Sequence, residues 1–221
     1  MKLAEIAEWL DSTLETSRFN DVSNNGVQLS RRGDEVNLVA FAVDASAASV
    51  AAAVKVGAQL LVVHHGISWG GGIKHISGGV YNVVRAAMDG DLAIYASHLP
   101  LDANPKVGNN AELARKYKLR KISPAFNYHG NVIGLVGTDP KGRKIGVCSG
   151  GAGEFAEEAK NLGCEEYVTG EASWGDVIAA ENAGMKMTLL GHYETETLGV
   201  KALACAMAKA LKVKTQFVGR E

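Results

Sequence analysis

The sequence predicts an α/β fold made of two similar halves, each built on a mostly parallel sheet. Apolar, strand-like segments alternate with helical segments, and the same alternation occurs again in the second half of the chain. Such an order favours parallel sheets. Several strand-like segments end directly in histidine or carboxylate residues. Because ligands of open α/β sheets bind beyond the carboxyl ends of the strands, a functional site is expected there, between the halves.

The first half begins with an amphipathic helical pattern that starts at Met1 and is followed by a turn-rich loop over residues 23–28. Apolar runs then predict strands, and alanine-rich or amphipathic runs predict the helices between them. The predicted strands are 36–43, 59–63 and 92–96, and the predicted helices are 46–56 and 80–88. Gly57 closes the first of these helices, at a position where helices favour glycine.

The second half repeats this plan with different lengths. A strand over 132–136 and a turn over 139–142 come first. The further predicted strands are 144–148, 166–169 and 186–190, and the predicted helices are 154–162, 174–183 and 197–211. The repeat predicts a division of the chain into 1–117 and 118–221, although the two halves together can also count as one domain.

Composition limits the classes of function. The chain has 221 residues, 47% of them hydrophobic, and a formal charge of −1, which gives no support to a nucleic-acid partner. Three widely spaced cysteines fit neither a zinc pattern nor a disulfide framework and favour a reducing compartment. The start of the chain lacks the pattern of a signal peptide, and no apolar run is long enough to span a membrane. We therefore expect a cytoplasmic protein without a membrane partner.

Four of the six histidines follow predicted strands. They are His64, His65, His98 and His192. Asp102 and Glu196 each follow a histidine by four residues, a spacing that lets two side chains face one site when the strand runs into a helical turn. A single histidine is more often a hydrogen-bonded core residue, but four at strand ends with matched acids favour a metal site. His75 and His129 lie outside the pattern and are interpreted as loop residues.

Imidazole and carboxylate donors suit zinc, iron, manganese or nickel, and the lack of a thiolate argues against a closed structural zinc site. Two ions need roughly five or six protein ligands and leave positions open for water. The cluster therefore predicts two divalent metal ions per chain.

The motifs over 62–66, 97–103 and 191–196, together with 24–29, resemble those of the GTP cyclohydrolase I type 2 homologues. These are NGG-interacting-factor-like, YbgI-type proteins with a dinuclear metal site. The resemblance covers nearly the whole chain. It implies two similar α/β halves, a dinuclear centre and a toroidal homohexamer built as a trimer of dimers.

The resemblance also assigns residues. The metal ligands of the family fall on His64, His65, Asp102, His192 and Glu196. His98 matches a histidine that lies near the metals in the family. We therefore expect His98 either to position the metal ligands or to move protons. This chain departs from the family after Thr169-Gly170-Glu171, because 172–176 lacks the histidine that many members carry there.

The predicted function is metal-assisted hydrolysis of a small molecule, for which the family name suggests a nucleotide. His98 would move protons and Glu171 would serve as a further acid or base. The alternative is a non-catalytic metal-binding protein of assembly or regulation. Two glycine-rich segments leave the sequence interpretation open: Ser149–Gly153 is an anion-binding loop or a tight turn, and Trp69–Ile73 is a lid or a plain loop.

Overall fold

The computed structural model describes residues 1–219 and divides the chain into two compact units. Unit 1 contains Met1–Leu101 and the segment that begins at Val200, and unit 2 contains Asp102–Gly199. This division differs from the predicted ranges 1–117 and 118–221. The physical reason is that strand β10 (Lys214–Phe217) pairs in parallel with β2 (Leu38–Asp44), so the C-terminal segment completes the first sheet.

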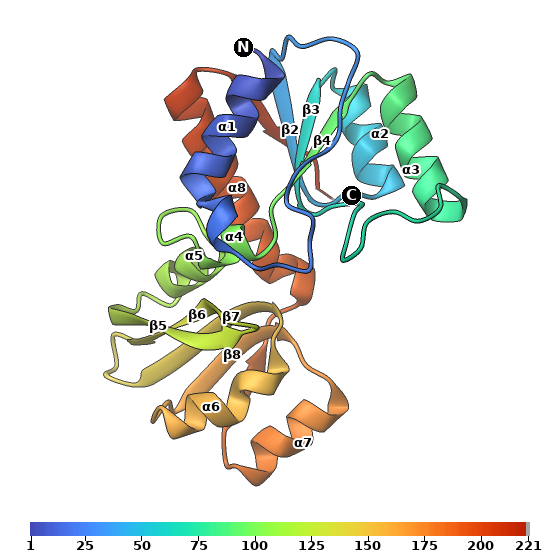
Figure 1. The fold of residues 1–221 in the computed structure, drawn as a ribbon. Coiled ribbons are helices and arrows are strands. Elements are labelled where there is room, and N and C mark those ends of the chain that lie inside the picture. The colour runs from blue at the N-terminus through green and yellow to red at the C-terminus, as the bar shows by residue number, and fades with distance from the viewer. Residues whose placement is uncertain (220–221) are drawn as a thin grey trace. The chain divides into compact units, whose positions relative to one another are not determined.

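Unit 1 has a five-stranded sheet in the order β1-β4-β3-β2-β10. Its remaining strands are β1 (Gly26–Leu29), β3 (Leu60–His65) and β4 (Ala93–Ala96). All neighbours are parallel except the pair β1 and β4. Figure 1 shows α2 (Ala47–Lys55) and α3 (Gly78–Asp89) on one side of this sheet, with α1 (Leu3–Leu14) and part of α8 (His192–Leu211) on the other. The predicted mostly parallel sheet is confirmed here.

The core of unit 1 forms where helices cover the parallel strands. Five successive residues of β2, from Val39 to Val43, are buried, as expected for a strand covered on both faces. Val50 of α2 and Val83 of α3 pack into this core. Helix α2 begins after Ser46, whose side chain accepts a hydrogen bond from Ser49 N–H. This packing gives the sheet a rigid frame for the loops at its strand ends.

Unit 2 has a second five-stranded sheet in the order β5-β6-β7-β8-β9. The strands are β5 (Arg120–Tyr128), β6 (Asn131–Thr138), β7 (Lys144–Gly151), β8 (Glu166–Glu171) and β9 (Lys186–Leu189). The pairs β5/β6 and β6/β7 are antiparallel, while β7/β8 and β8/β9 are parallel. The sheet is therefore mixed, and the expected mostly parallel sheet is confined to its second part.

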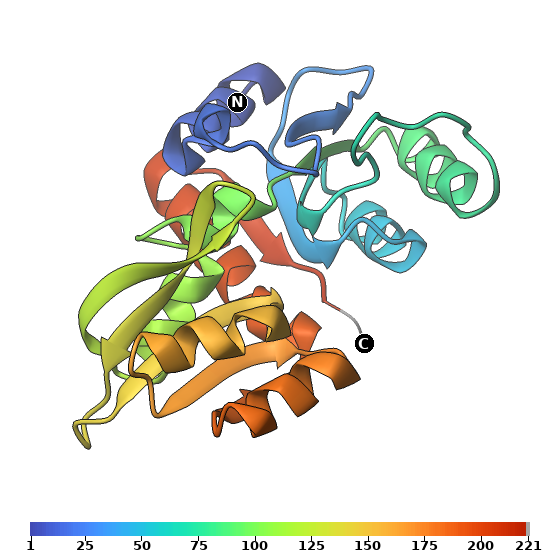
Figure 2. The same ribbon diagram turned by 60° about the horizontal axis from the view of Figure 1, so that its bottom comes forward.

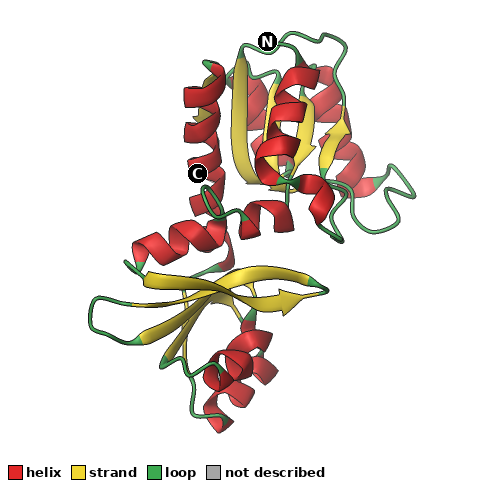
Figure 3. Cartoon of the chain, turned by 60° about the vertical axis from the view of Figure 1, so that its left-hand side comes forward, coloured by secondary structure: helices red, strands yellow, loops and turns green. Residues whose placement is uncertain are grey.

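Helices cover both faces of this second sheet (Figures 2 and 3). Figure 1 shows α5 (Asn109–Lys116) on one face, and α6 (Ala156–Asn161) with α7 (Trp174–Asn182) on the other. Leu113 of α5 packs with Val147 of β7 in a buried apolar cluster. The order β7-α6-β8-α7-β9 repeats the order β2-α2-β3-α3-β4 of unit 1. The repeated α/β plan predicted from the sequence is confirmed.

The chain passes from one unit to the other within two helices. The short α4 (Leu99–Ala103) leads from unit 1 into unit 2, and α8 leads back. Helix α8 begins at His192, five residues before the predicted start at residue 197. His192 and Glu196 are therefore one helical turn apart on α8, as their spacing predicted.

Candidate metal centre

In unit 1, three histidines form one cluster at the ends of β3 and β4. His64 and His65 end β3, and His98 follows β4 by two residues. The imidazole centroids of His64 lie 4.6 Å from His65 and 5.0 Å from His98, and those of His65 and His98 are 5.7 Å apart. Each ring offers a ligand nitrogen, and these nitrogens all lie within 4.8 Å of one another. This spacing is close enough for a shared metal ion, so the His98 ring lies beside the proposed ligands His64 and His65.

Each of these rings is fixed through its Nδ1 atom. His64 Nδ1 bonds to the carbonyl oxygen of Ser97, His65 Nδ1 to Asp44 Oδ1, and His98 Nδ1 to Asp21 Oδ1, each at 2.9 Å. The partners are all acceptors, so each Nδ1 carries the proton in the neutral ring. Nε2 is then the nitrogen that would bind a metal ion, and histidine ligands in proteins are held in this way.

Asp21 and Asp44 were not found by sequence reasoning. Asp44 ends β2 directly beside His65 in the parallel register. It could have been predicted by the criterion used for the histidines, a metal-binding residue type at the end of a strand. Asp21 lies in a loop before β1, and its neighbours in the sequence give no comparable signal. Burial by itself raises the pKa of Asp21, but the hydrogen bond and charge of His98 and the bonds from Asn25 and Ser23 outweigh it and lower that pKa to about 2.

In unit 2, His192 and Glu196 meet on the first turns of α8. His192 Nε2 lies 3.0 Å from Glu196 Oε1, and His192 Nδ1 lies 2.9 Å from Glu171 Oε1 at the end of β8. The hydrogen bond to Glu196 is the largest influence on the pKa of His192. Burial opposes it, the charge of Glu196 and the bond to Glu171 add to it, and the pKa rises to about 9. A metal ion bound at His192 Nε2 would replace the proton that this nitrogen shares with Glu196.

Asp102 lies in α4 at the start of unit 2 and is buried. Its Oδ1 accepts hydrogen bonds from Asn109 Nδ2 at 2.9 Å and from the Ser149 hydroxyl at 3.1 Å. Asn109 Oδ1 in turn accepts from the N–H of Gly199 in α8, at 2.8 Å. Two neutral donors thus hold an acidic side chain in place, as expected for a carboxylate that binds a cation.

The glycine-rich segment Ser149–Gly153 is neither a tight turn nor an open anion-binding loop, because it covers the last residues of β7, up to Gly151, and the start of a 3-10 helix at Gly153. The N–H groups of Ser149, Gly150 and Ala152 donate to side chains of unit 2, at 2.7–3.3 Å. Gly150 has φ +69°, and a Cβ atom there would lie 2.5 Å from Glu196 Oε1. The small residues therefore make room for a proposed metal ligand.

The segment Trp69–Ile73 begins beside the histidines of unit 1. The Trp69 ring centroid lies 5.2 Å from that of His98 and 5.9 Å from that of His65, and Trp69 Nε1 donates to the carbonyl oxygen of Gly66 at 2.9 Å. Ser23 forms an isolated antiparallel bridge with Trp69. These contacts hold Trp69 in place and favour an ordinary loop over a lid at this position.

His75 and His129, the two histidines outside the pattern, lie in loops and are exposed, as predicted.

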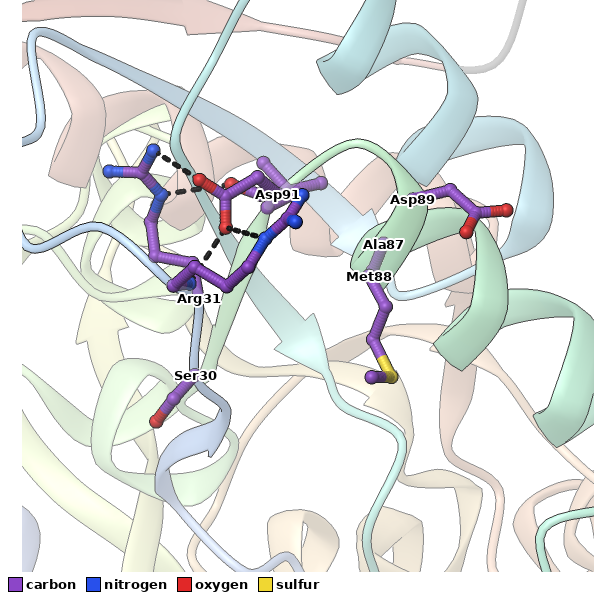
Figure 4. Close-up of a pocket in the computed structure, with 8 residues that line it drawn as sticks. Ser30, Arg31, Ala87, Met88, Asp89 and Asp91 are labelled. Carbon is purple, nitrogen blue, oxygen red and sulfur yellow. Dashed lines mark hydrogen bonds and ion pairs between the residues drawn. The ribbon is translucent and has the colours of Figure 1, made fainter.

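Figure 4 shows a pocket of about 490 Å³ at the opposite end of β4. Arg31 points toward Asp91 there, and Arg31 Nη2 lies 2.7 Å from Asp91 Oδ2. Because Asp91 precedes β4 and His98 follows it, this pocket is separate from the histidine cluster. Its ion pair joins the chain after β1 to the turn before β4, a structural role.

The candidate donors within each unit fit metal binding by their chemistry. In unit 1, the side chains close enough to share an ion are the three histidines, and in unit 2, His192 lies beside Glu196. Such a set suits zinc, iron, manganese or nickel in a site with open positions. The fold and these clusters define an α/β protein with candidate metal ligands at its strand ends.

The chain belongs to the Duf34/NIF3 (NGG1p interacting factor 3) family, whose model matches residues 1–142 and 127–220. The GTP cyclohydrolase 1 type 2 homolog of Pyrococcus horikoshii is 37% identical over 97% of this chain and 96% of its own. That of Archaeoglobus fulgidus is 37% identical over 99% of this chain and 98% of its own. The resemblance found in the motifs is thus confirmed.

Solved structures agree with this assignment. The protein ybgI, of unknown function, matches with a TM-score of 0.92 and 26% identity over 100% of this chain and 99% of its own. TTHA1606 from Thermus thermophilus matches with a TM-score of 0.84 and 28% identity, with the same coverage of both chains.

Proposed function

We propose that this protein is a hydrolase that holds two divalent metal ions per chain and acts on a small molecule. The proposed ligands are His64, His65, Asp102, His192 and Glu196, the set carried over from the family. The observation that supports the proposal best is the fixing of each imidazole at Nδ1 by a carboxylate or carbonyl oxygen. Proteins fix histidines in this manner when Nε2 binds a metal.

When bound, two such ions supply Lewis acidity and make water a nucleophile near neutral pH. His98, with Nδ1 bonded to Asp21, would accept a proton at Nε2. Glu171 is bonded to His192, so it would orient that ring, and its use as an acid or base stays a prediction.

A nucleotide is the first substrate to test, because relatives are named as homologs of GTP cyclohydrolase 1 type 2. Unit 2 also contains a pocket of about 310 Å³ whose lining includes Asp102, Arg115 and Ile133. This volume is at the lower end of the range of small-molecule sites, and the mainly apolar lining with a few polar groups is typical of them.

The test combines metal analysis with an activity screen. Protein purified without chelators is expected to contain about two divalent ions per chain, and the metal-loaded protein is expected to hydrolyse a member of a panel of nucleotides, phosphoesters and peptides. Metal content well below one ion per chain after supplementation would refute the metal centre. Two bound ions without turnover of any panel member would instead support the non-catalytic metal-binding protein.

The resemblance further leads us to propose a toroidal homohexamer in the cytoplasm. Among the described residues, no helix has the length and apolar character needed to cross a membrane. Light scattering on the purified protein is expected to give the mass of six chains, and a monomer mass would refute this assembly.

A further inference from the structure

We infer that Asp21 is a positioning residue for His98, and that the segment Asp21–Gln28 clamps the histidine cluster of unit 1. This segment contains the turn-rich motif that the sequence singles out, and none of its residues is a proposed metal ligand. The inference deepens the proposed function and rests on it for its consequence in metal binding. The clamp itself follows from hydrogen bonds within unit 1.

The Asp21 carboxylate accepts hydrogen bonds from several parts of unit 1. Its two oxygens accept four hydrogen bonds, from His98 Nδ1, Leu99 N–H and Asn25 Nδ2 at 2.9 Å and from Ser23 N–H at 3.1 Å. The side chain is only 1% exposed, so water cannot replace these partners easily. Because every partner is a donor, the site requires a carboxylate, and an amide would turn its NH₂ group toward two donors.

His98 is held at both its ring and its backbone. Asp21 Oδ1 accepts a hydrogen bond from Nδ1 of the ring, and Asn25 Oδ1 accepts one from the backbone N–H of His98, each at 2.9 Å. The ring therefore has one orientation and one neutral tautomer, with the proton on Nδ1. Nε2 keeps the lone pair that a metal ion or a reacting proton requires.

The other end of the segment holds the loop after His65. Gln28 Oε1 accepts the N–H groups of Ile67 and Ser68 at 2.6 and 3.0 Å, and Gln28 Nε2 donates to the Asn24 carbonyl at 2.7 Å. A Cβ atom at Gly66 would lie 2.2 Å from Gln28 Oε1, so glycine is needed for this approach. One segment thus fixes the surroundings of both His65 and His98.

A purely structural role for Asp21 makes a different prediction. In that case Asp21→Asn would lower stability without changing the state of the His98 ring. The pair of Asp44 and His65 offers a matched control, because it has the same 2.9 Å bond but the Asp44 side chain is 30% exposed. Water can replace a lost partner there, and Asp44→Asn is expected to change its histidine less.

The test is a double-mutant cycle with two readouts. Heteronuclear NMR of the histidine ring nitrogens in the metal-free protein reports the tautomer of His98. Competition with a chelator gives zinc affinity for the wild type, Asp21→Asn, His98→Ala and the double variant. We expect Asp21→Asn to mix the tautomers of His98 and to weaken zinc binding roughly tenfold. The double variant should bind zinc no more weakly than His98→Ala, because Asp21 acts through His98.

Additive losses in the cycle, or an unchanged His98 tautomer in Asp21→Asn, would overturn the inference. If Asp21→Asn does not fold, Asn25→Ala is measured by the same NMR experiment. It removes the acceptor of the His98 N–H and keeps the carboxylate, so a shifted His98 signal is expected and an unaltered one contradicts the clamp. Absence of zinc binding in the wild type would refute the metal centre, whereas the NMR result would still decide the role of Asp21.

Discussion

At the scale of single residues, the sequence locates the proposed ligands better than their supports. His64, His65 and His192 could be found because residue type and strand-end position coincide. Asp21 could not, since its role depends on a fold that brings it to His98, 77 residues further along the chain. Hydrogen-bond partners of this kind leave no periodic pattern in the sequence.

The raised pKa of His192 gives a prediction for the metal-free protein. A raised folded-state pKa means that the pair with Glu196 stabilises the fold below the ordinary histidine pKa, and that this contribution is lost as pH rises through about 9. NMR titration should show a His192 pKa near that value. Because Glu196 contributes the largest influence, Glu196→Gln should lower this pKa more than Glu171→Gln does. An equal or reversed order would contradict the assignment.

Metal counts on variants separate ligands from bystanders. Asp102→Asn keeps the shape of the side chain but removes the charge that offsets the cations, so the variant should retain one ion or none. His75→Ala is the control, because His75 is exposed in a loop. It should keep about two ions per chain. The assignment is wrong if elemental analysis finds the full metal content in Asp102→Asn and no bound metal in His75→Ala.

At the scale of elements, runs with strong periodicity were predictable and irregular ones were not. The buried β2 and the capped α2 match their predicted segments within two residues. Strand β5 was missed because it is exposed over Arg120–Pro124 and its register with β6 shifts there. Helix α8 starts earlier than predicted because His192 and its polar neighbours give its first turn no apolar stripe.

Gly150, which has a positive φ near the end of β7, gives a prediction with a matched control. Gly150 and Gly142 both have positive φ, so alanine at either position costs about 1 kcal/mol. Only at Gly150 would the added methyl group meet Glu196, because nothing lies within 4 Å of a Cβ at Gly142. Both variants should melt at a lower temperature, and only Gly150→Ala should also lose zinc affinity in a chelator competition. Similar zinc affinities in the two variants would contradict a close contact with Glu196.

At the scale of the whole molecule, the α/β class was predictable and the division into units was not. The repeated strand–helix order is visible in the sequence, because each parallel strand is a short apolar run. The return of the C-terminal segment to unit 1 is not, because β10 has only four residues with alternating burial and its partner β2 lies far earlier in the chain. Long-range pairing of this kind depends on the complete fold.

The C-terminal segment therefore gives the last prediction. Val218 is buried in the core of unit 1 and donates its N–H to the Phe41 carbonyl, whereas Gln216 on β10 is exposed. Val218→Asp places an unpaired carboxylate in an apolar core, which costs about 3 kcal/mol or more. A chain of this size should then melt on the order of 10 °C lower. Gln216→Asp adds the same charge at the surface and should melt within a few degrees of the wild type. Equal melting temperatures of the two variants in calorimetry would show that this segment does not complete unit 1.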